Sequence, residues 1–156
     1  LTRFSSEEIR KNISDKSRIR GVFTSREQVI GFLKDIKAKD LGMSVVITGV
    51  LSEVLPACKE AGVTPHSINY SLGVWGNKSR LPDDDTLSIT TMCGHHMIPP
   101  KFVEDVQKQV DKGKITAEEG AEKLSNFCYC GIFNQIRCAE ILNIVSEKKK
   151  RDATGA

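Results

Sequence analysis

Apolar residues recur at helical spacing in several parts of the chain. One stripe follows Thr24 and Glu27, which have the spacing of a helix capping box; its members are Val29, Ile30, Phe32, Leu33 and Ile36. Ser5 and Glu8 share the capping-box spacing, and residues 51–62 carry a further helical pattern. Capping residues followed by a 3.6-residue apolar period are typical of amphipathic helices, so we predict helices in these three segments.

Four other short runs are rich in β-branched residues or alternate apolar with polar positions. These runs cover residues 18–23, 44–50, 66–74 and 86–92. Such runs are typical of strands, and their alternation with helical patterns predicts βαβ units with right-handed crossovers. We therefore expect an α/β fold in which residues 18–92 form a small sheet with helices packed on it.

The carboxyl-terminal part is patterned for helices alone. Pro99 and Pro100 suit a helix start, and Thr116 with Glu119 forms another capping-box pair. A last helix is predicted at or just after the segment CYCG, with a buried stripe made of Cys138, Ile141, Leu142 and Val145. We expect three helices here and assign residues 93–147 to a helical part that carries a metal site.

Composition limits the class of protein. A chain of 156 residues can bury one ordinary core, so we expect a single domain over residues 1–156. The formal charge of +3 comes mainly from the basic run 148–151, within a solvated tail over residues 148–156, and such a tail is weak support for nucleic-acid binding. The chain shows neither a membrane-length apolar run nor a secretion signal, so we expect a cytoplasmic protein.

The cysteines are the residues most suggestive of chemistry. Five is an odd number, which argues against a secreted disulfide scaffold. We expect Cys58 and Cys138 to pack in cores, because isolated cysteines and cysteines on an apolar stripe usually do. The remaining thiols belong to the segments CGHH and CYCG, and two short antiparallel helices between these segments would bring them together. We expect one pocket that holds Cys93, Cys128 and Cys130 with His95, His96 or both.

Our first interpretation of this pocket is an iron–sulfur cluster, 4Fe-4S, held by Cys93, Cys128 and Cys130. A fourth iron left open would act as a Lewis acid on a small substrate, and Asn134 and Arg137, one and two helical turns after Cys130, would bind the substrate's carboxylate. An enzyme of this kind would be a lyase or hydratase, or would handle sulfur. Without a substrate, the protein would be an oxidoreductase component that transfers electrons to a redox protein partner. The CYCG segment resembles iron–sulfur proteins of anaerobic metabolism over those few residues.

Two alternatives stay open. The first is a single zinc ion in a Cys3His set made of Cys93, Cys128, Cys130 and either His95 or His96, which would stabilise a module that binds a protein partner. The single residue between the members of each pair is atypical of zinc fingers. The second is metal-free chemistry, in which Cys93 or Cys130 is a nucleophile with a histidine as its base, or in which two thiols form a redox pair.

Overall fold

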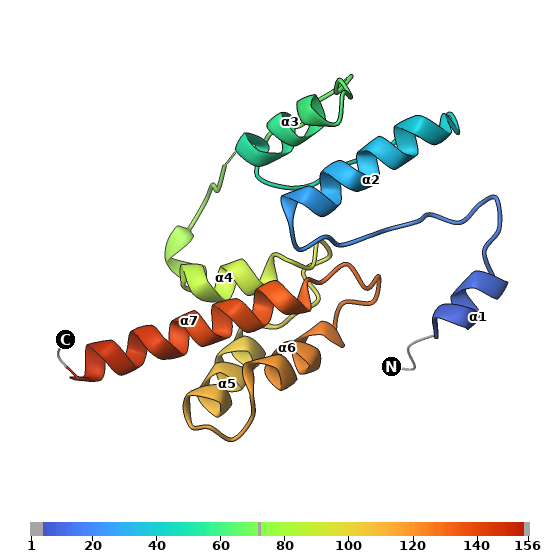
Figure 1. Ribbon diagram of the computed structural model, residues 1–156. Helices are drawn as coiled ribbons and strands as arrows, with labels where there is room; N and C mark the ends of the chain where they lie inside the picture. Colours follow the sequence, from blue (N-terminus) through green and yellow to red (C-terminus); the bar gives the residue numbers. More distant parts are fainter. Residues whose placement is uncertain (1–4, 72, 155–156) are drawn as a thin grey trace. The chain divides into compact units, whose positions relative to one another are not determined.

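All regular elements of the protein are helices. A computed structural model describes residues 5–71 and 73–154. Within these two ranges there is no β-strand, so the predicted α/β fold with a βαβ sheet is wrong. The elements are α1 (Ser6–Lys11), α2 (Arg26–Lys39), α3 (Leu51–Glu60), a 3₁₀ turn (Lys78–Arg80), α4 (Asp84–Thr90), α5 (Pro100–Asp111), α6 (Ala117–Ser125) and α7 (Gln135–Thr154) (Figure 1).

Three of the four predicted strands lie in irregular segments. Residues 18–23, 44–50 and 66–74 pair with no other segment in the described part of the chain, and Val46 is 89% exposed. Leu72, which belongs to the alternating pattern of the third run, lies outside the described residues. A strand is stable only when neighbouring strands pair with its backbone and pack against its side chains, so a β-branched run without partners does not form a sheet.

The fourth predicted strand, residues 86–92, belongs mostly to α4. The carboxylate of Asp83 caps this helix, because its Oδ1 accepts the backbone N–H of Thr86 at 2.9 Å. The buried positions follow at helical spacing and are Thr86, Ile89, Thr90 and Cys93. The acidic run at residues 83–85 is therefore the start of a helix, and its cap outweighs the weak strand preference of the residues after it.

The predicted helix starts were mostly correct. Both capping boxes, at Ser5 with Glu8 and at Thr116 with Glu119, are confirmed. At α2 the cap is shifted by one residue: Ser25 accepts the Gln28 N–H, whereas Thr24 donates its backbone N–H to the Gln28 side chain. The predicted helices over 51–62 and after the two prolines are confirmed as α3 and α5.

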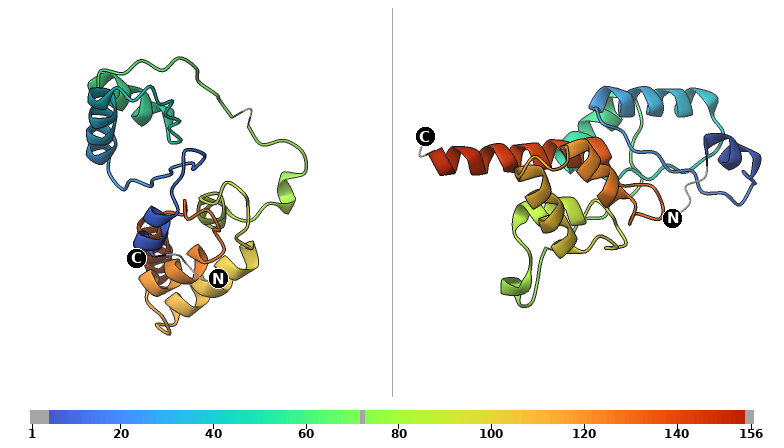
Figure 2. Two further views of the ribbon diagram at one scale, coloured as in Figure 1. Left: turned by 90° about the vertical axis from the view of Figure 1, so that its right-hand side faces the viewer. Right: turned by 90° about the horizontal axis from the view of Figure 1, so that it is seen from below.

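The chain divides into two compact units, residues 1–22 with 81–156 and residues 23–80. In the second unit, α2 packs on α3 around a small core that contains Cys58. In the first unit, α4, α5, α6 and α7 pack on one another, and α7 contacts the other three (Figures 1 and 2). The central residues of this larger core include Ile89, Cys93, Ile98, Val106, Leu124, Cys138 and Leu142.

A glycine allows α6 to approach its neighbours closely. A Cβ atom at Gly120 would lie 2.9 Å from Val106 Cγ1 on α5 and 3.2 Å from Leu142 Cδ1 on α7. Such distances are too short for carbon atoms in contact, so only glycine lets the three helices meet here without a shift. The close packing positions α6 and α7, which flank the loop that carries Cys128 and Cys130.

The predicted basic tail continues α7 as far as it is described. Residues 148–154 are helical and exposed, and residues 155–156 lie outside the described ranges. One tail side chain is engaged, because Lys149 Nζ lies 2.7 Å from Asp111 Oδ2 on α5. In the part of the chain that the structure describes, no helix combines the length and apolar content needed to cross a membrane.

Asp111 is the centre of a polar network between α5 and α7. Its carboxylate accepts hydrogen bonds from Gln107, Ser146 and Lys149. Burial alone would raise the pKa of Asp111, but these three donors outweigh burial and hold the pKa below its ordinary value of 3.8. The ionised carboxylate therefore stabilises the contact between the two helices.

We predict that Asp111→Asn lowers the free energy of unfolding by about 1 kcal/mol at neutral pH, because the amide keeps an acceptor but loses the charge. The folded-state pKa is below 3.8, so the contribution is present above that pH and is lost as pH falls through the folded-state pKa. Urea unfolding at pH 7 and at pH 3 tests this. The exposed Asp152→Asn is the control, and an Asp111→Asn deficit of equal size at both pH values would contradict the prediction.

Candidate metal centre

Two loops of the first unit meet through their cysteine and histidine side chains. One loop follows α4 and carries Cys93 and His95; the other precedes α7 and carries Cys128 and Cys130. Cys130 Sγ lies 3.7 Å from His95 Nδ1 and 3.9 Å from Cys128 Sγ. The Cys93 thiol in turn interacts with the Cys128 thiol. The four side chains thus form a connected cluster, which we call the thiol cluster.

Both loops reverse direction immediately after their first cysteine. The Cys93 carbonyl accepts the His96 N–H at 2.9 Å, and the Cys128 carbonyl accepts the Gly131 N–H at 3.0 Å. His96 and Gly131 adopt left-handed φ angles of 52° and 68°, which glycine adopts freely and histidine only occasionally. Each reversal folds the following backbone N–H groups back toward the cysteine sulfur.

The Cys93 sulfur shows the effect of this folding. Burial alone would raise the pKa of Cys93. The backbone N–H groups of Met97, His95 and His96, with the Cys128 thiol, outweigh burial, so the pKa of Cys93 is lowered. A ring of N–H donors around a sulfur stabilises the thiolate, which is the form that binds metals.

The Cys128 sulfur has a similar backbone environment but more thiol neighbours. Burial raises the pKa of Cys128, the N–H groups of Phe133 and Ile132 lower it, and the thiols of Cys130 and Cys93 raise it again, so that the net shift is upward. Negative charge on several adjacent sulfurs is unfavourable unless a cation compensates it. In this arrangement the Cys128 sulfur therefore favours the protonated thiol.

The cluster extends from the core to the surface. Cys93 is 0% exposed and Cys128 is 5% exposed, whereas Cys130 is half-buried and His95 is exposed. In the described ranges, no group of three or more Cys, His, Asp or Glu side chains is arranged so that it could hold a metal ion. The contacts form an open chain from Cys93 through Cys128 and Cys130 to His95.

The other predicted site residues have local partners. His96 is exposed and forms the corner of its turn. Asn134 Oδ1 accepts the backbone N–H of Arg137 at 3.0 Å, and Arg137 Nη1 donates to Glu140 Oε2 at 3.0 Å. These bonds support the first turn of α7. The role of Asn134 and Arg137 in binding a substrate carboxylate stays a prediction.

The remaining cysteines are confirmed as core residues. Cys58 is buried between α2 and α3, and Cys138 is fully buried in the larger core, where burial raises its pKa to about 12. Sequence reasoning missed the N–H donors of Met97, Ile132 and Phe133. No side-chain pattern could have revealed them, because they arise from the turn geometry of the backbone.

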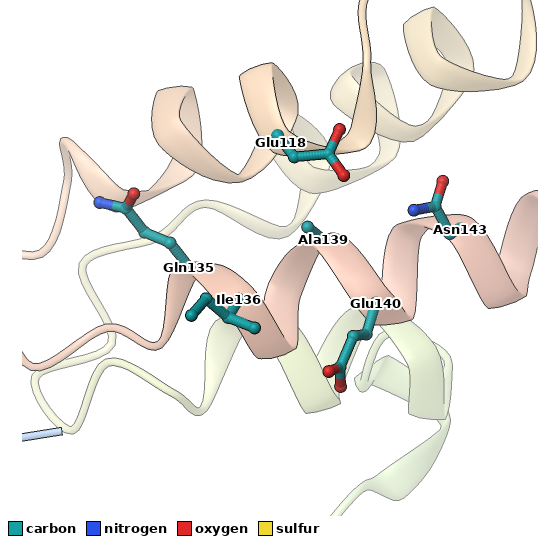
Figure 3. Close-up of a pocket in the computed structure, with 6 residues that line it drawn as sticks. All are labelled: Glu118, Gln135, Ile136, Ala139, Glu140 and Asn143. Carbon is teal, nitrogen blue, oxygen red and sulfur yellow. The ribbon is translucent and has the colours of Figure 1, made fainter. Parts of the chain in front are cut away.

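A separate depression of about 300 Å³ lies along α6 and the first turns of α7 (Figure 3). It is lined by Glu118, Gln135, Ile136, Ala139, Glu140 and Asn143. None of these residues belongs to the thiol cluster, so the depression is no entrance to it.

Comparison of the chain with protein-family models, with curated proteins and with solved structures found no match. The chemistry open to the site follows from its own groups. Three thiols and an imidazole are the ligands that zinc, copper and iron–sulfur clusters select. The same groups without a metal place a thiol beside a base, since Cys130 Sγ and His95 Nδ1 are 3.7 Å apart.

Proposed function

We propose that Cys93, His95, Cys128 and Cys130 bind a single zinc ion that links the loop after α4 to the loop before α7. The observation that carries the proposal is the spacing of the potential ligand atoms, 3.9 Å between two sulfurs and 3.7 Å between a sulfur and a ring nitrogen. His95 and Cys130 are 35 positions apart in the sequence, so the spacing between their nitrogen and sulfur atoms is a property of the fold.

The spacing favours one ion over a cluster. Sulfur and nitrogen ligands at zinc bond lengths and tetrahedral angles are about 3.5 to 3.8 Å apart. Thiolates that bind different irons of a 4Fe-4S cluster lie at different corners of it and are roughly 6 Å apart. Closing the zinc site requires rotation of His95 and Cys130, which lie nearest to the surface.

A zinc ion with four protein ligands is structural. Its function here would be to hold the two loops in a fixed relation and to shape a surface that binds a protein partner. The exposed apolar side chains of Met97, Tyr129 and Ile132, which belong to the same loops, support this use. None of the five cysteines forms a disulfide. Cysteines in this state fit a reducing compartment, so we propose a cytoplasmic protein.

An iron–sulfur cluster is the second candidate. The backbone N–H groups directed at Cys93 and Cys128 favour it, because such hydrogen bonds to sulfur are a usual feature of cluster sites. This candidate requires the Cys128 and Cys130 sulfurs, which are 3.9 Å apart on one loop, to move apart so that they bind different irons.

Metal analysis of the chain purified without oxygen tests both candidates. The zinc proposal predicts a colourless protein with about one zinc ion per chain. Cobalt exchanged for zinc would then give the intense visible absorption of a tetrahedral, thiolate-rich site. A brown protein that contains iron and acid-labile sulfide would overturn the zinc proposal in favour of the cluster. A protein with neither metal would overturn both.

A further inference from the structure

Two of the cluster thiols lie next to each other on one loop and differ in their exposure to solvent. The Sγ atoms of Cys128 and Cys130 are 3.9 Å apart, so the two sulfurs are in contact. Cys130 is half-buried, whereas Cys128 is 5% exposed and its thiol lies against that of Cys93, which is 0% exposed. A molecule in solution therefore reaches the Cys130 sulfur first, and the Cys128 sulfur is already beside it.

The backbone turn of this loop suits a disulfide between the two cysteines. In an extended chain, residues two positions apart have Cα atoms about 7 Å apart, beyond the roughly 4.4 to 6.8 Å that a disulfide spans. Here the chain turns at once, because the Cys128 carbonyl accepts the Gly131 N–H at 3.0 Å, and the turn shortens the Cα separation. A disulfide bond is about 2.05 Å long, so an approach of the sulfurs by roughly 2 Å would join them.

The loop leaves room for a reactant beside Cys130. A Cβ atom added to Gly131, its neighbour, or to Gly94 in the opposite loop would meet no atom within 4 Å. Tyr129, which separates the two cysteines in the sequence, is 84% exposed. A reactant can thus approach the Cys130 sulfur without displacing a core side chain.

An exposed thiol in contact with a second thiol is suited to react with a disulfide. Attack on a disulfide leaves the first thiol bonded to a sulfur that a neighbouring thiol can displace. Contact between the two thiols makes this displacement an intramolecular step, which is fast because no second encounter is needed. A reactant that leaves no displaceable group on the first sulfur would make no use of the second thiol. The pair therefore favours a disulfide as its co-reactant.

We propose that Cys128 and Cys130 form a site of thiol–disulfide exchange. The Cys130 sulfur bonds to one sulfur of the substrate, the substrate's S–S bond breaks, and its other sulfur leaves with the electron pair. Cys128 then attacks the Cys130 sulfur, forms the Cys128–Cys130 disulfide and releases the first substrate sulfur. The two thiol protons end on the two released sulfurs, so the substrate is reduced to two thiols and the cysteine pair is oxidised. No metal takes part, so this exchange does not rest on the proposed zinc site.

The reduced chain, mixed with less than one equivalent of dithiobis(nitrobenzoate) in the presence of a strong chelator, tests the proposal. This aromatic disulfide releases a coloured thiol, and the chelator keeps metal from shielding the cysteines. We expect two coloured thiols per disulfide consumed and a protein that has lost two hydrogen atoms and carries no adduct. A lasting adduct, with one thiol released, would overturn the proposal.

Peptide mapping locates the new bond. After the remaining thiols are blocked, trypsin releases residues 124–137 as one peptide with both Cys128 and Cys130, whereas Cys93 lies in the peptide 81–101. The disulfide should lie within the peptide 124–137. A cross-link between the two peptides would show that Cys93 completes the exchange and would overturn the proposed pair.

Variants assign the role of each thiol. Cys128→Ser should release one coloured thiol per disulfide and keep the other half as an adduct on Cys130. Cys130→Ser should react at least about tenfold more slowly, because the remaining thiols of the cluster are buried. Cys58→Ser, in the other compact unit, should behave as the parent. Release of both coloured thiols by Cys128→Ser would contradict the assignment.

Two further measurements complete the test. Zinc content, measured before the chelator is added, separates the two proposals: a chain that contains zinc but keeps the adduct refutes the exchange site alone, and a chain without zinc that forms the disulfide refutes the zinc site alone. Oxidised glutathione and a disulfide-bonded peptide, used in turn, distinguish a small substrate from a protein one by which oxidises the pair faster. Oxidation of the pair by neither would overturn the proposal.

Discussion

Cys128→Ala should reduce bound zinc from about one ion per chain to the background level. Cys128 is the central residue of the thiol cluster, because its thiol contacts both Cys93 and Cys130. Removing it leaves two separated thiols and a histidine, too few ligands for a stable tetrahedral site. Metal analysis after dialysis against a weak chelator measures the loss, and thermal unfolding should show a lower midpoint for the variant than for the zinc-loaded parent.

Cys58→Ala is the matched control, because Cys58 is also a buried cysteine but lies between α2 and α3 in the other compact unit. This variant should lose some stability and keep its zinc. Retention of zinc by Cys128→Ala would show that the ligand assignment is wrong. Equal loss of zinc in both variants would show that zinc binding depends on the overall stability of the fold and not on the thiol cluster.

Leu142→Ala should lower the free energy of unfolding by about 3 kcal/mol. Leu142 is 0% exposed, lies on the central face of α7 and reaches α6 beside Gly120. The smaller side chain leaves a cavity that the close approach of α6 prevents from collapsing. Urea unfolding followed by far-ultraviolet circular dichroism measures the change.

Ile144→Ala on the same helix serves as the comparison. Ile144 is 53% exposed, so its truncation removes few contacts and should change stability by less than about 0.5 kcal/mol. Because the chain has two compact units, two transitions are possible, and the Leu142 effect belongs to the one in which α4 to α7 unfold. Similar losses in the two variants would contradict the packing described for α7.

Helix starts were the part of the fold that the sequence predicted best. The pairs Ser5 with Glu8 and Thr116 with Glu119 formed the capping boxes expected of them. A cap is a local interaction over four residues, so its sequence contains most of what determines it. The buried stripe of α7 was predictable for the same reason, since one helix face repeats at a fixed period.

The strands were the part that failed, because their formation depends on residues elsewhere in the chain. The run 44–50 has a high strand preference but finds no partner in the described ranges. Residues 86–92 carry both an alternating pattern typical of a strand and an apolar spacing typical of a helix. The helix forms, because Asp83 caps it and Ile89 and Cys93 are buried at helical spacing. Comparing how well the apolar positions fit a helical period and an alternating period would have predicted this helix from the sequence.

The composition of the candidate site was predictable, but its geometry was not. Three cysteines and two histidines in two short segments indicated a common pocket. The sequence did not decide which histidine faces Cys130, because the answer depends on the left-handed turn at His96 that directs His95 toward the other loop. The spacing of the sulfurs, which favours one ion over a cluster, is likewise a property of the folded loops.

The contact between Cys130 and His95 closes a loop of 35 residues that contains α5 and α6. A bound ion would act there as a cross-link and would restrict the unfolded chain as a disulfide does. For a loop of this length the entropic stabilisation is about 4 kcal/mol. Unlike a disulfide, this cross-link responds to free metal in its surroundings, so the stability of the whole helical unit would vary with zinc supply.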